Sequence, residues 1–316
     1  MIDSSVFRQA IPAEVTAHHA EVAAWYEGRP NAWEFPAHVV RAARDAGESI
    51  FGLPVHSPRA VVREVLSKVG SIPIRIVAPD TEPRGVYLHI HGGGWVLGAA
   101  AHHDDLSTAM ADACSVVVVS VDYRLAPEHP YPAGADDCES VAVWLTAQAQ
   151  QEFGSNRLLI GGESAGANLA AVTLLRMRDR HDYTKFACAN LVYGAYDLTD
   201  TPSVRGVGDG SLILNGPIIK WFQDQYVPAE LRSNPDVSPL YARLHDMPPA
   251  IFTVGTLDPL LDDSLFMASR WTAAGNIART EVVPGAIHAF DYFPTDQAER
   301  ARTAMHDFLN KHLHPS

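Results

Sequence analysis

The chain of 316 residues contains 24 Lys and Arg against 37 Asp and Glu, so its net charge is −13, and 47% of its residues are apolar. This length and composition are typical of a globular protein with a substantial core, built as one large domain or as roughly two smaller ones. The acidic balance repels phosphate backbones and anionic lipid headgroups, which excludes nucleic-acid binding and electrostatic membrane attachment as leading hypotheses.

The sequence has no segment typical of a membrane span or a secretory leader. No stretch approaches the roughly 18 uninterrupted apolar residues that cross a bilayer, and the N-terminus lacks a basic region followed by an apolar one. Cys114, Cys138 and Cys188 are odd in number and widely spaced, which fits neither a disulfide framework nor a zinc site. We expect a cytoplasmic protein with its cysteines in the core. The sequence leaves open whether the chain forms a homo-oligomer.

Within the first third of the chain, the residue pattern changes from one typical of helices to one typical of strands. Helix-forming residues prevail from Glu14 to about Ala60 and are broken by Gly28–Pro30 and Pro36, which predicts two or three short helices. Val61–Val69 and Ile72–Val77 then alternate apolar with polar residues on either side of a Gly-Ser pair. This period of two predicts an antiparallel hairpin at the start of a sheet.

Short β-rich runs then alternate with helical stretches. The predicted strands are Val86–Ile90, Val116–Val121, Leu158–Ile160, Ala187–Tyr193, Ile251–Val254 and Thr280–Val283. The predicted helices are Asp104–Asp112, Ala135–Gln151, Ala165–Arg178, Leu261–Ala274 and Asp296–Leu313. This alternation indicates a mainly parallel sheet covered on both faces. The stretch Asp200 to Pro228, with its aromatic helical segment Ile218–Tyr226, interrupts the alternation and indicates an insertion.

Gly162, Ser164 and Gly166 form the pattern G-x-S-x-G between a short apolar run and a helical segment. In a nucleophile elbow the serine occupies a strained strand-to-helix turn, and glycines two residues away let the neighbouring backbone pass without a Cβ clash. The pattern alone also arises as a glycine-rich turn with a surface serine. Its position between a predicted strand and a predicted helix favours the interpretation of Ser164 as a nucleophile over that of a surface serine.

Three consecutive glycines follow the predicted strand Val86–Ile90, within the segment His91 to Trp95. Acyl-transfer enzymes of the α/β class place an oxyanion loop at this position, and each backbone donor there typically contributes a factor of about a hundred to a thousand in rate. We expect the N–H groups of Gly93, Gly94 and Ala165 to be these donors.

A serine nucleophile needs a base and an acid that orients the base, and in this class both follow the serine in the order Ser, Asp, His. His288, on a loop just after the last predicted strand, is the predicted base. Asp258 follows the strand Ile251–Val254 and is the predicted acid, because the proline after it fixes the turn. Asp197, which follows the preceding strand, is its rival.

Other acidic and histidine groups have simpler explanations. Asp262 and Asp263 begin a predicted helix, where the helix dipole and free N–H groups favour acidic residues. His89 and His91 lie two apart on a strand, and the segment His102–Asp105 follows, which suggests a metal site by residue type. We instead assign His91 to the glycine loop and interpret His102–Asp105 as a solvated helix start.

With these motifs the chain resembles the bacterial hormone-sensitive-lipase-like (family IV) carboxylesterases, a branch of the α/β hydrolases. The matching segments occur in family order over about two hundred residues: His91–Trp95, Asp122–Pro130, Gly162–Gly166, Asp258–Leu260 and Pro284–Phe290. The string Tyr-Arg-Leu-Ala-Pro-Glu in the second segment is the most specific. The resemblance implies an α/β-hydrolase fold, with a mainly parallel eight-stranded sheet, helices on both faces and a helical cap.

The resemblance also implies domain boundaries and residue roles. Residues 1–60 and an insertion at about 198–230 would form the cap, and residues 61–316 the catalytic domain. The triad would be Ser164, Asp258 and His288, with Gly93, Gly94 and Ala165 as the oxyanion hole. Glu163 stands where many members carry Asp, a change that keeps the charge. Within Asp122–Pro130, we interpret the string as structural and expect Arg124 and Glu128 to pair beneath the oxyanion loop.

The resulting hypothesis is a serine carboxylesterase that hydrolyses small, short-acyl-chain esters and needs neither a cofactor nor a metal. Trp95, Phe290, Trp33 and Phe35 are candidate pocket residues, although core packing explains most aromatic residues of the cap. An amidase or a metabolite-specific deacetylase would use the same triad, and the same fold can serve as a non-catalytic binding protein. The motifs do not separate these alternatives.

Overall fold

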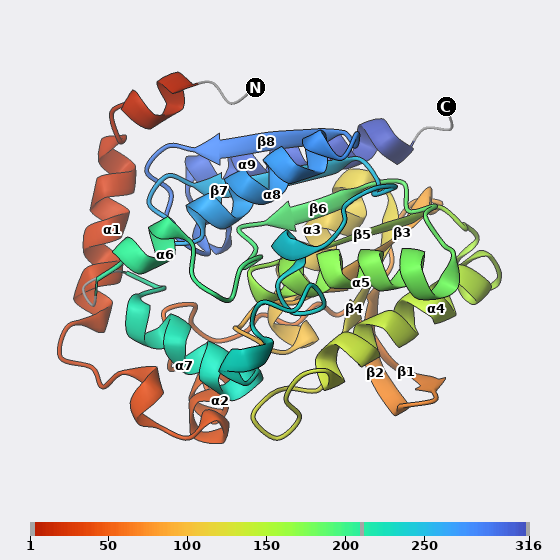
Figure 1. Ribbon diagram of the computed structural model, residues 1–316, viewed down its shortest axis with the longest axis horizontal. Helices are drawn as coiled ribbons and strands as arrows, with labels where there is room; N and C mark the ends of the chain where they lie inside the picture. Colours follow the sequence, from red (N-terminus) through yellow and green to blue (C-terminus); the bar gives the residue numbers. More distant parts are fainter. Residues whose placement is uncertain (1–3, 209–211, 314–316) are drawn as a thin grey trace.

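A computed structural model describes residues 4–208 and 212–313, and eight strands of these residues form a single sheet (Figure 1). The strands are β1 (Val61–Ser67), β2 (Gly70–Val77), β3 (Gly85–Ile90), β4 (Val116–Val121), β5 (Leu158–Glu163), β6 (Ala189–Val192), β7 (Ala250–Gly255) and β8 (Ala278–Val283). Their order is β1-β2-β4-β3-β5-β6-β7-β8. Only the β1–β2 and β2–β4 pairs of this sheet are antiparallel. The predicted mainly parallel eight-stranded sheet is confirmed.

The predicted hairpin forms one edge of the sheet. Val65 of β1 lies opposite Ile72 of β2, and both side chains are buried, whereas the adjacent Leu66 is exposed. This alternation matches the period of two in the sequence, because successive side chains of a strand point to opposite faces.

The central strands are buried along their whole length, as in β3, β4, β5 and β7. Strands covered on both faces have no polar side, which explains the uninterrupted apolar run of β4. The six strands β3 to β8 are parallel, so their carboxyl ends meet at one edge of the sheet. Ligand sites of open α/β sheets lie at this edge.

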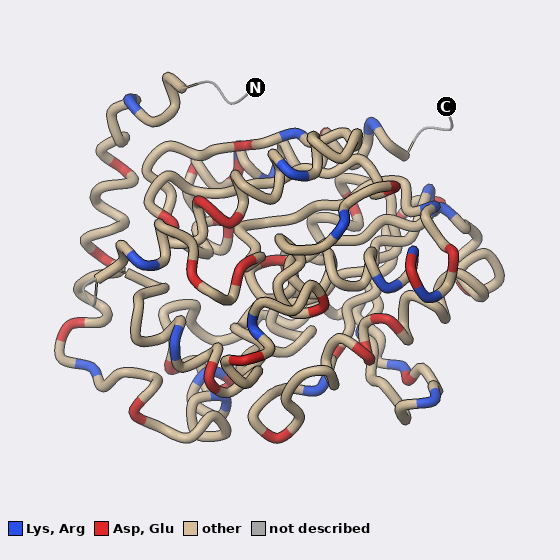
Figure 2. Tube along the Cα trace, viewed as in Figure 1, with Lys and Arg blue, Asp and Glu red and all other residues tan. Residues whose placement is uncertain are grey.

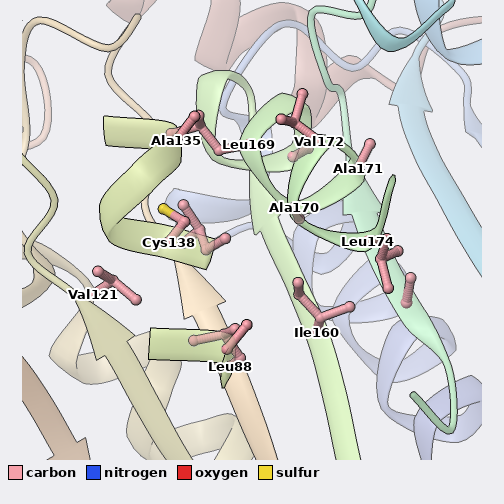
Figure 3. Packing of buried hydrophobic residues seen from close by; sticks show 14 of the residues in the cluster. Leu88, Val121, Ala135, Cys138, Ile160, Leu169, Ala170, Ala171, Val172 and Leu174 are labelled. Carbon is pink, nitrogen blue, oxygen red and sulfur yellow. The ribbon is translucent and has the colours of Figure 1, made fainter. Parts of the chain in front are cut away.

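Helices cover both faces of the sheet. They are α3 (Asp104–Cys114), α4 (Ala133–Phe153), α5 (Ala165–His181), α8 (Leu261–Ala273) and α9 (Asp296–Leu313). Helices α4, α5 and α8 pack on one face in a large apolar cluster, part of which is drawn in Figure 3, where Leu88 and Ile160 of the strands lie near Cys138 of α4 and Leu169 of α5. Helices α3 and α9 pack on the opposite face, with Phe308 among the buried residues there. The predicted helical cover on both faces is confirmed.

Four further helices lie outside this layered core and gather toward one side of the molecule in Figure 1. They are α1 (Ala13–Tyr26), α2 (Ala37–Asp45), α6 (Pro202–Gly206) and α7 (Gly216–Tyr226). Trp33 joins an apolar cluster with Ile218, Ile219 and Phe222, so the N-terminal segment contacts the segment after β6. The proposed domain boundaries stay predictions, and residues 1–3 and 209–211 within the expected cap lie outside the described residues.

Short 3₁₀ helices complete the described structure: Ser4–Arg8, Ala32–Glu34, Ala100–His103, Ala229–Leu231, Pro239–Tyr241 and Phe290–Tyr292. The three cysteines are free and buried, as predicted. Among the helices that the structure describes, none is both long and apolar enough to cross a membrane. Basic and acidic residues are interspersed along the trace (Figure 2).

Candidate active site

Ser164 lies at the turn between β5 and α5 and has the strained backbone of a nucleophile elbow. Its φ of 56° and ψ of −119° fall in a region that residues with a Cβ rarely adopt. A Cβ at Gly162 would lie 2.1 Å from the carbonyl oxygen of Ile90, and one at Gly166 would lie 1.9 Å from the same oxygen. Both glycines are therefore required by the close approach of β3 to the elbow.

Three side chains from separate turns meet at the carboxyl edge of the sheet. Nε2 of His288 lies 3.0 Å from Oγ of Ser164, and Nδ1 lies 2.9 Å from Oδ2 of Asp258. Asp258 also accepts the backbone N–H of Leu260 at 2.9 Å, and both Asp258 and His288 are buried. With the imidazole proton on Nδ1 and donated to Asp258, Nε2 is left to accept the serine proton.

The rival acid, Asp197, belongs to a different group of contacts. Its Oδ1 accepts the backbone N–H and the hydroxyl of Thr199 at 2.8 and 2.6 Å, and the Tyr241 hydroxyl lies 3.1 Å from both carboxylate oxygens. Within residues 4–208 and 212–313, only Asp258 forms a hydrogen bond to His288 through a carboxylate. The structure therefore brings the predicted base together with the predicted acid and not with its rival.

The glycine loop after β3 presents free backbone donors near Ser164. Gly93 has φ 116° and Gly94 has φ 61°, and a Cβ at Gly93 would lie 2.2 Å from the carbonyl oxygen of Leu97. A Cβ at Gly94 would lie 2.2 Å from the ring of Phe222, so α7 lies against the loop. Across the described residues, no hydrogen bond is donated by the backbone N–H of Gly93, Gly94 or Ala165.

A nucleophile elbow, its hydrogen-bonded histidine and acid, and a glycine loop with free N–H groups thus lie at one sheet edge. A family model described as "alpha/beta hydrolase fold" matches residues 87–292. The chain belongs to this family. The predicted membership of its hormone-sensitive-lipase-like branch is confirmed by the relatives described next.

Two curated relatives and one solved structure of α/β hydrolases illustrate the similarity. The carboxylic ester hydrolase LipN of Mycobacterium tuberculosis is 36% identical over 236 residues, which cover 70% of this chain and 61% of LipN. The ethyl acetate hydrolase of Pseudomonas putida is 30% identical over 257 residues, which cover 77% of this chain and 79% of that enzyme. A hyperthermophilic esterase from the archaeon Pyrobaculum calidifontis aligns with a TM-score of 0.85 at 28% identity, covering 96% of this chain and 99% of that one.

In this α/β hydrolase the expected pair of Arg124 and Glu128 is not formed. Arg124 instead binds Asp137 of α4, with Nη2 2.8 Å from Oδ1. Glu128 binds Arg41 of α2, whose Nη1 and Nη2 lie 3.0 and 2.8 Å from the two carboxylate oxygens. Arg41 also donates from Nε to the carbonyl oxygen of Val96 at 2.7 Å. The prediction was wrong because α2, which is distant in sequence, supplies the cation that binds Glu128 and also holds the glycine loop at Val96.

A buried polar network lies behind the nucleophile and was missed in the sequence. Nε2 of His89 lies 3.0 Å from Oε2 of Glu163, and Nδ1 of His89 lies 2.9 Å from the Ser120 hydroxyl. His103 approaches the same carboxylate oxygen at 3.7 Å and hydrogen-bonds with the Tyr292 hydroxyl at 2.6 Å. His89, His103 and Glu163 are close enough to hold a metal ion by donor type, but all three already have hydrogen-bonding partners.

The segment His102–Asp105 is not the solvated helix start that the sequence suggested. His103 and Asp104 are 1% exposed, and Asp104 accepts hydrogen bonds from Nε and Nη2 of Arg75 at 2.6 and 2.5 Å. Burial lowers the pKa of His103 well below its usual value. The neutral ring is thus one member of the network behind Glu163.

His91 supports the glycine loop, as predicted. Its Nδ1 lies 2.8 Å from the carbonyl oxygen of Gly92, and its ring stacks on Tyr123 with centroids 4.3 Å apart. Burial lowers the pKa of His91 to about 3, so the ring is neutral at physiological pH. A neutral, packed histidine holds the loop without adding a charge beside the oxyanion position.

A second buried acid, Asp291, is linked to the His288 ring through Tyr193. The Tyr193 ring lies 4.6 Å from the His288 ring, and its hydroxyl donates to Oδ1 of Asp291 at 2.5 Å. Burial raises the pKa of Asp291 to about 6. Tyr193 thus packs against the His288 ring in a tilted arrangement, and Asp291 fixes the Tyr193 hydroxyl.

Asp262 and Asp263 begin α8 as predicted, but their carboxylates bind another segment. Asp263 accepts the backbone N–H groups of Tyr196 and Asp197 at 2.7 and 2.8 Å and the Thr201 hydroxyl at 2.7 Å. Asp262 accepts a backbone N–H of this segment at 2.9 Å. Burial raises the pKa of Asp263 to about 7. The two acids hold the chain after β6, which the helix-dipole interpretation did not foresee.

The four aromatic candidates for the pocket have different surroundings. Trp95 is buried and stacks on Tyr226 with centroids 4.5 Å apart, and Phe290 is buried in the cluster around Tyr193. Trp33 packs beside α7, whereas Phe35 is exposed. Their assignment as substrate-contacting residues stays a prediction.

Proposed function

We propose that this α/β hydrolase is a serine carboxylesterase that cleaves small carboxylic esters with short acyl chains. The observation that carries the proposal is the contact chain from Ser164 through His288 to Asp258, beside unpaired backbone donors. The named activities of the relatives, carboxylic ester hydrolysis and ethyl acetate hydrolysis, support it.

The reaction follows from the geometry of these three side chains. His288 takes the Ser164 proton at Nε2 while Oγ attacks the ester carbonyl carbon, and the C–O bond to the alcohol breaks as His288 returns the proton to the leaving oxygen. Water then gives a proton to His288 and attacks the acyl-serine, releasing the acid and restoring the hydroxyl. Asp258 holds the imidazole tautomer and stabilises the imidazolium.

The glycine loop would supply the electrostatic stabilisation. The carbonyl oxygen gains negative charge in the tetrahedral intermediate, and the N–H groups of Gly93, Gly94 and Ala165 are fixed by the backbone before the substrate arrives. Preorganised donors of this kind need no reorganisation during the reaction. The first N–H of α5 also lies at the positive end of the helix dipole.

The preference for short acyl chains rests on the close packing above the oxyanion loop. The Phe222 ring lies directly against Gly94, and Trp95 is buried against Tyr226. We expect these contacts to restrict the room for an acyl chain on that side of the loop, which favours small acyl groups over fatty-acid chains. We also expect the protein to act in the cytoplasm.

The test is hydrolysis of p-nitrophenyl esters from acetate to palmitate by the wild type and Ser164→Ala, with folding checked by circular dichroism. We expect activity to peak at the short esters and to be lost in the variant. A folded wild type that hydrolyses none of these esters would contradict the proposal and favour a narrow amidase, a dedicated deacetylase or a binding protein.

A further inference from the structure

A cavity of about 260 Å³ lies beside the loop that follows His288. Its wall includes the end of α2, the segment 49–55, the start of α3 and the residues just after the 3₁₀ helix Phe290–Tyr292. The lining residues that matter here are Arg44, Ser49, Phe51, Leu53, His102 and Phe293. Neither the triad nor the oxyanion glycines line this cavity.

The cation at this wall, Arg44, is partly exposed and makes no direct ion pair among the described residues, although the neighbouring Asp45 carboxylate attracts it at longer range. The Arg44 guanidinium carbon lies 5.1 Å from the centre of the Phe51 ring, and in the described part of the chain it makes no hydrogen bond or ion pair. The neighbouring Asp45 is bound to Nε2 of His102 at 2.8 Å. Burial lowers the pKa of Arg44, which reflects the cost of a charge removed from water.

Arg176, which is more deeply buried than Arg44, shows the contrast. Arg176 is 3% exposed and is surrounded by the carboxylates of Asp136, Glu139 and Asp236, at 2.8, 3.0 and 2.5 Å. Buried charges are normally paired in this way, because an uncompensated one is costly. Among the residues that the structure describes, the Arg44 guanidinium has no such direct carboxylate partner, and its place at a cavity wall leaves it available to bind an anion from outside the chain.

Oγ of Ser49 and Nδ1 of His102 belong to lining residues and have no hydrogen bond among the described residues, but both atoms are buried and do not open onto the cavity. The acid that lines the cavity, Asp105, is exposed and accepts the N–H of Leu106 at the start of α3.

The remaining wall is apolar and has an open rim. Phe51 and Phe293 stack with ring centroids 5.9 Å apart, and Leu53 and Val55 at the rim are 69% and 71% exposed. A cavity of about 150 Å³ already accommodates benzene, so this one has room for a phenyl ring or a short alkyl chain with a charged end group. Such a ligand would cover apolar surface that is now exposed to water.

We propose that this cavity is a binding site for a small organic carboxylate, separate from the triad. The planar guanidinium of Arg44 would hold the carboxylate by two parallel hydrogen bonds, a geometry that a single-atom anion such as chloride cannot accept. The apolar part of the ligand would lie against Phe51, Phe293 and Leu53. The site thus recognises one negative charge attached to a small apolar group.

The test is titration of the full-length protein with benzoate and with the uncharged benzamide, followed by saturation-transfer NMR of the ligand. We expect saturable benzoate binding that is weakened about tenfold or more by Arg44→Met, and much weaker binding of benzamide. Arg29→Met is the matched control, because Arg29 also lies over an aromatic ring, that of Trp25, at 4.5 Å. It should leave the affinity for benzoate unchanged.

A second pair of variants decides the question if Arg44→Met does not fold. Leu53→Asp places a negative charge at the exposed rim and should weaken benzoate binding several-fold, whereas the uncharged Leu53→Asn of equal size should not. Equal affinity for benzoate and benzamide, binding insensitive to both Arg44→Met and Leu53→Asp, or no saturable binding in the millimolar range would overturn the proposal.

Discussion

Asp258 and Asp197 follow neighbouring parallel strands, yet only Asp258 holds Nδ1 of His288. We expect Asp258→Asn to lower kcat for p-nitrophenyl acetate by a factor on the order of 10⁴, because an amide no longer fixes the productive tautomer or stabilises imidazolium. Asp197→Asn is the matched control and should keep kcat near the wild-type value. Equal losses in the two variants would show that the acid is assigned wrongly.

Gly94 is fixed both by its backbone and by its neighbour. Gly94→Ala strains a φ of 61° and places a Cβ 2.2 Å from the Phe222 ring. We expect kcat/KM to fall about 100-fold, as when one oxyanion donor is displaced. Gly154→Ala imposes similar strain at φ 76°, with no atom within 4 Å, and should lower stability while activity stays. Full activity of Gly94→Ala would contradict the role of this loop.

At the residue scale, the sequence predicted contacts that depend on local motifs. The glycines around Ser164 and the turn at Asp258 are recognisable from patterns of a few residues, although the contact that requires the glycines comes from Ile90 of β3. The partner of Glu128 is Arg41, 87 positions away, and no local pattern favours it over the nearby Arg124. Side-chain pairing between distant elements therefore required the three-dimensional structure.

Arg41 of helix α2 hydrogen-bonds with the glycine-loop segment at Val96 and with Ala126 and Glu128 beyond it. We expect Arg41→Ala to lower kcat about tenfold, because a small displacement of the loop misplaces its donors. Arg41→Lys should recover part of the loss. Steady-state kinetics measures the loss of kcat, and thermal unfolding measures any loss of stability, so the two effects of the substitution can be separated.

The control for Arg41 is Arg63→Ala. Arg63 binds Glu152 at 2.9 Å on the exposed side of the hairpin, far along the sheet order from the triad. Its loss should change neither kcat nor KM. If both variants lowered activity only in proportion to their loss of folded protein, Arg41 would have no positioning role.

At the scale of elements, the spacing of apolar residues predicted the strands and long helices, because buried positions recur at regular intervals along each of them. The hairpin and α9 lie where the pattern indicated. The start of α3 misled the interpretation, because a run of His and Asp is usually solvated, whereas here Arg75 from β2 and the carboxylate of Glu163 surround it. Polar residues buried by partners on other strands leave no periodic signal.

At the scale of the whole molecule, buried acids couple stability to pH. The pKa of Asp291 is raised from 3.8 to about 6, so the folded state binds this proton more tightly than the unfolded chain. Its contribution to stability is therefore complete below about pH 4 and is lost as pH rises toward 6 and above. Over this window the loss is about 3 kcal/mol, at about 1.4 kcal/mol per pKa unit.

Replacing Asp291 should remove this dependence. Relative to the wild type, we expect Asp291→Asn to gain free energy of unfolding as the pH increases from about 4 to about 7, measured by urea denaturation. Asp246→Asn, at an exposed carboxylate, is the control and should follow the wild-type profile. An Asp291→Asn profile parallel to that of the wild type would contradict the assignment.

The central claim for the whole molecule is that Ser164 carries the acyl group during turnover. The most direct measurement is rapid acid quenching during p-nitrophenyl acetate hydrolysis, followed by peptide mass spectrometry. We predict an acetyl group on the peptide that contains Ser164, formed with a burst of p-nitrophenol and absent in Ser164→Ala. Continued hydrolysis in that variant, or an acetyl group confined to another residue, would contradict the account.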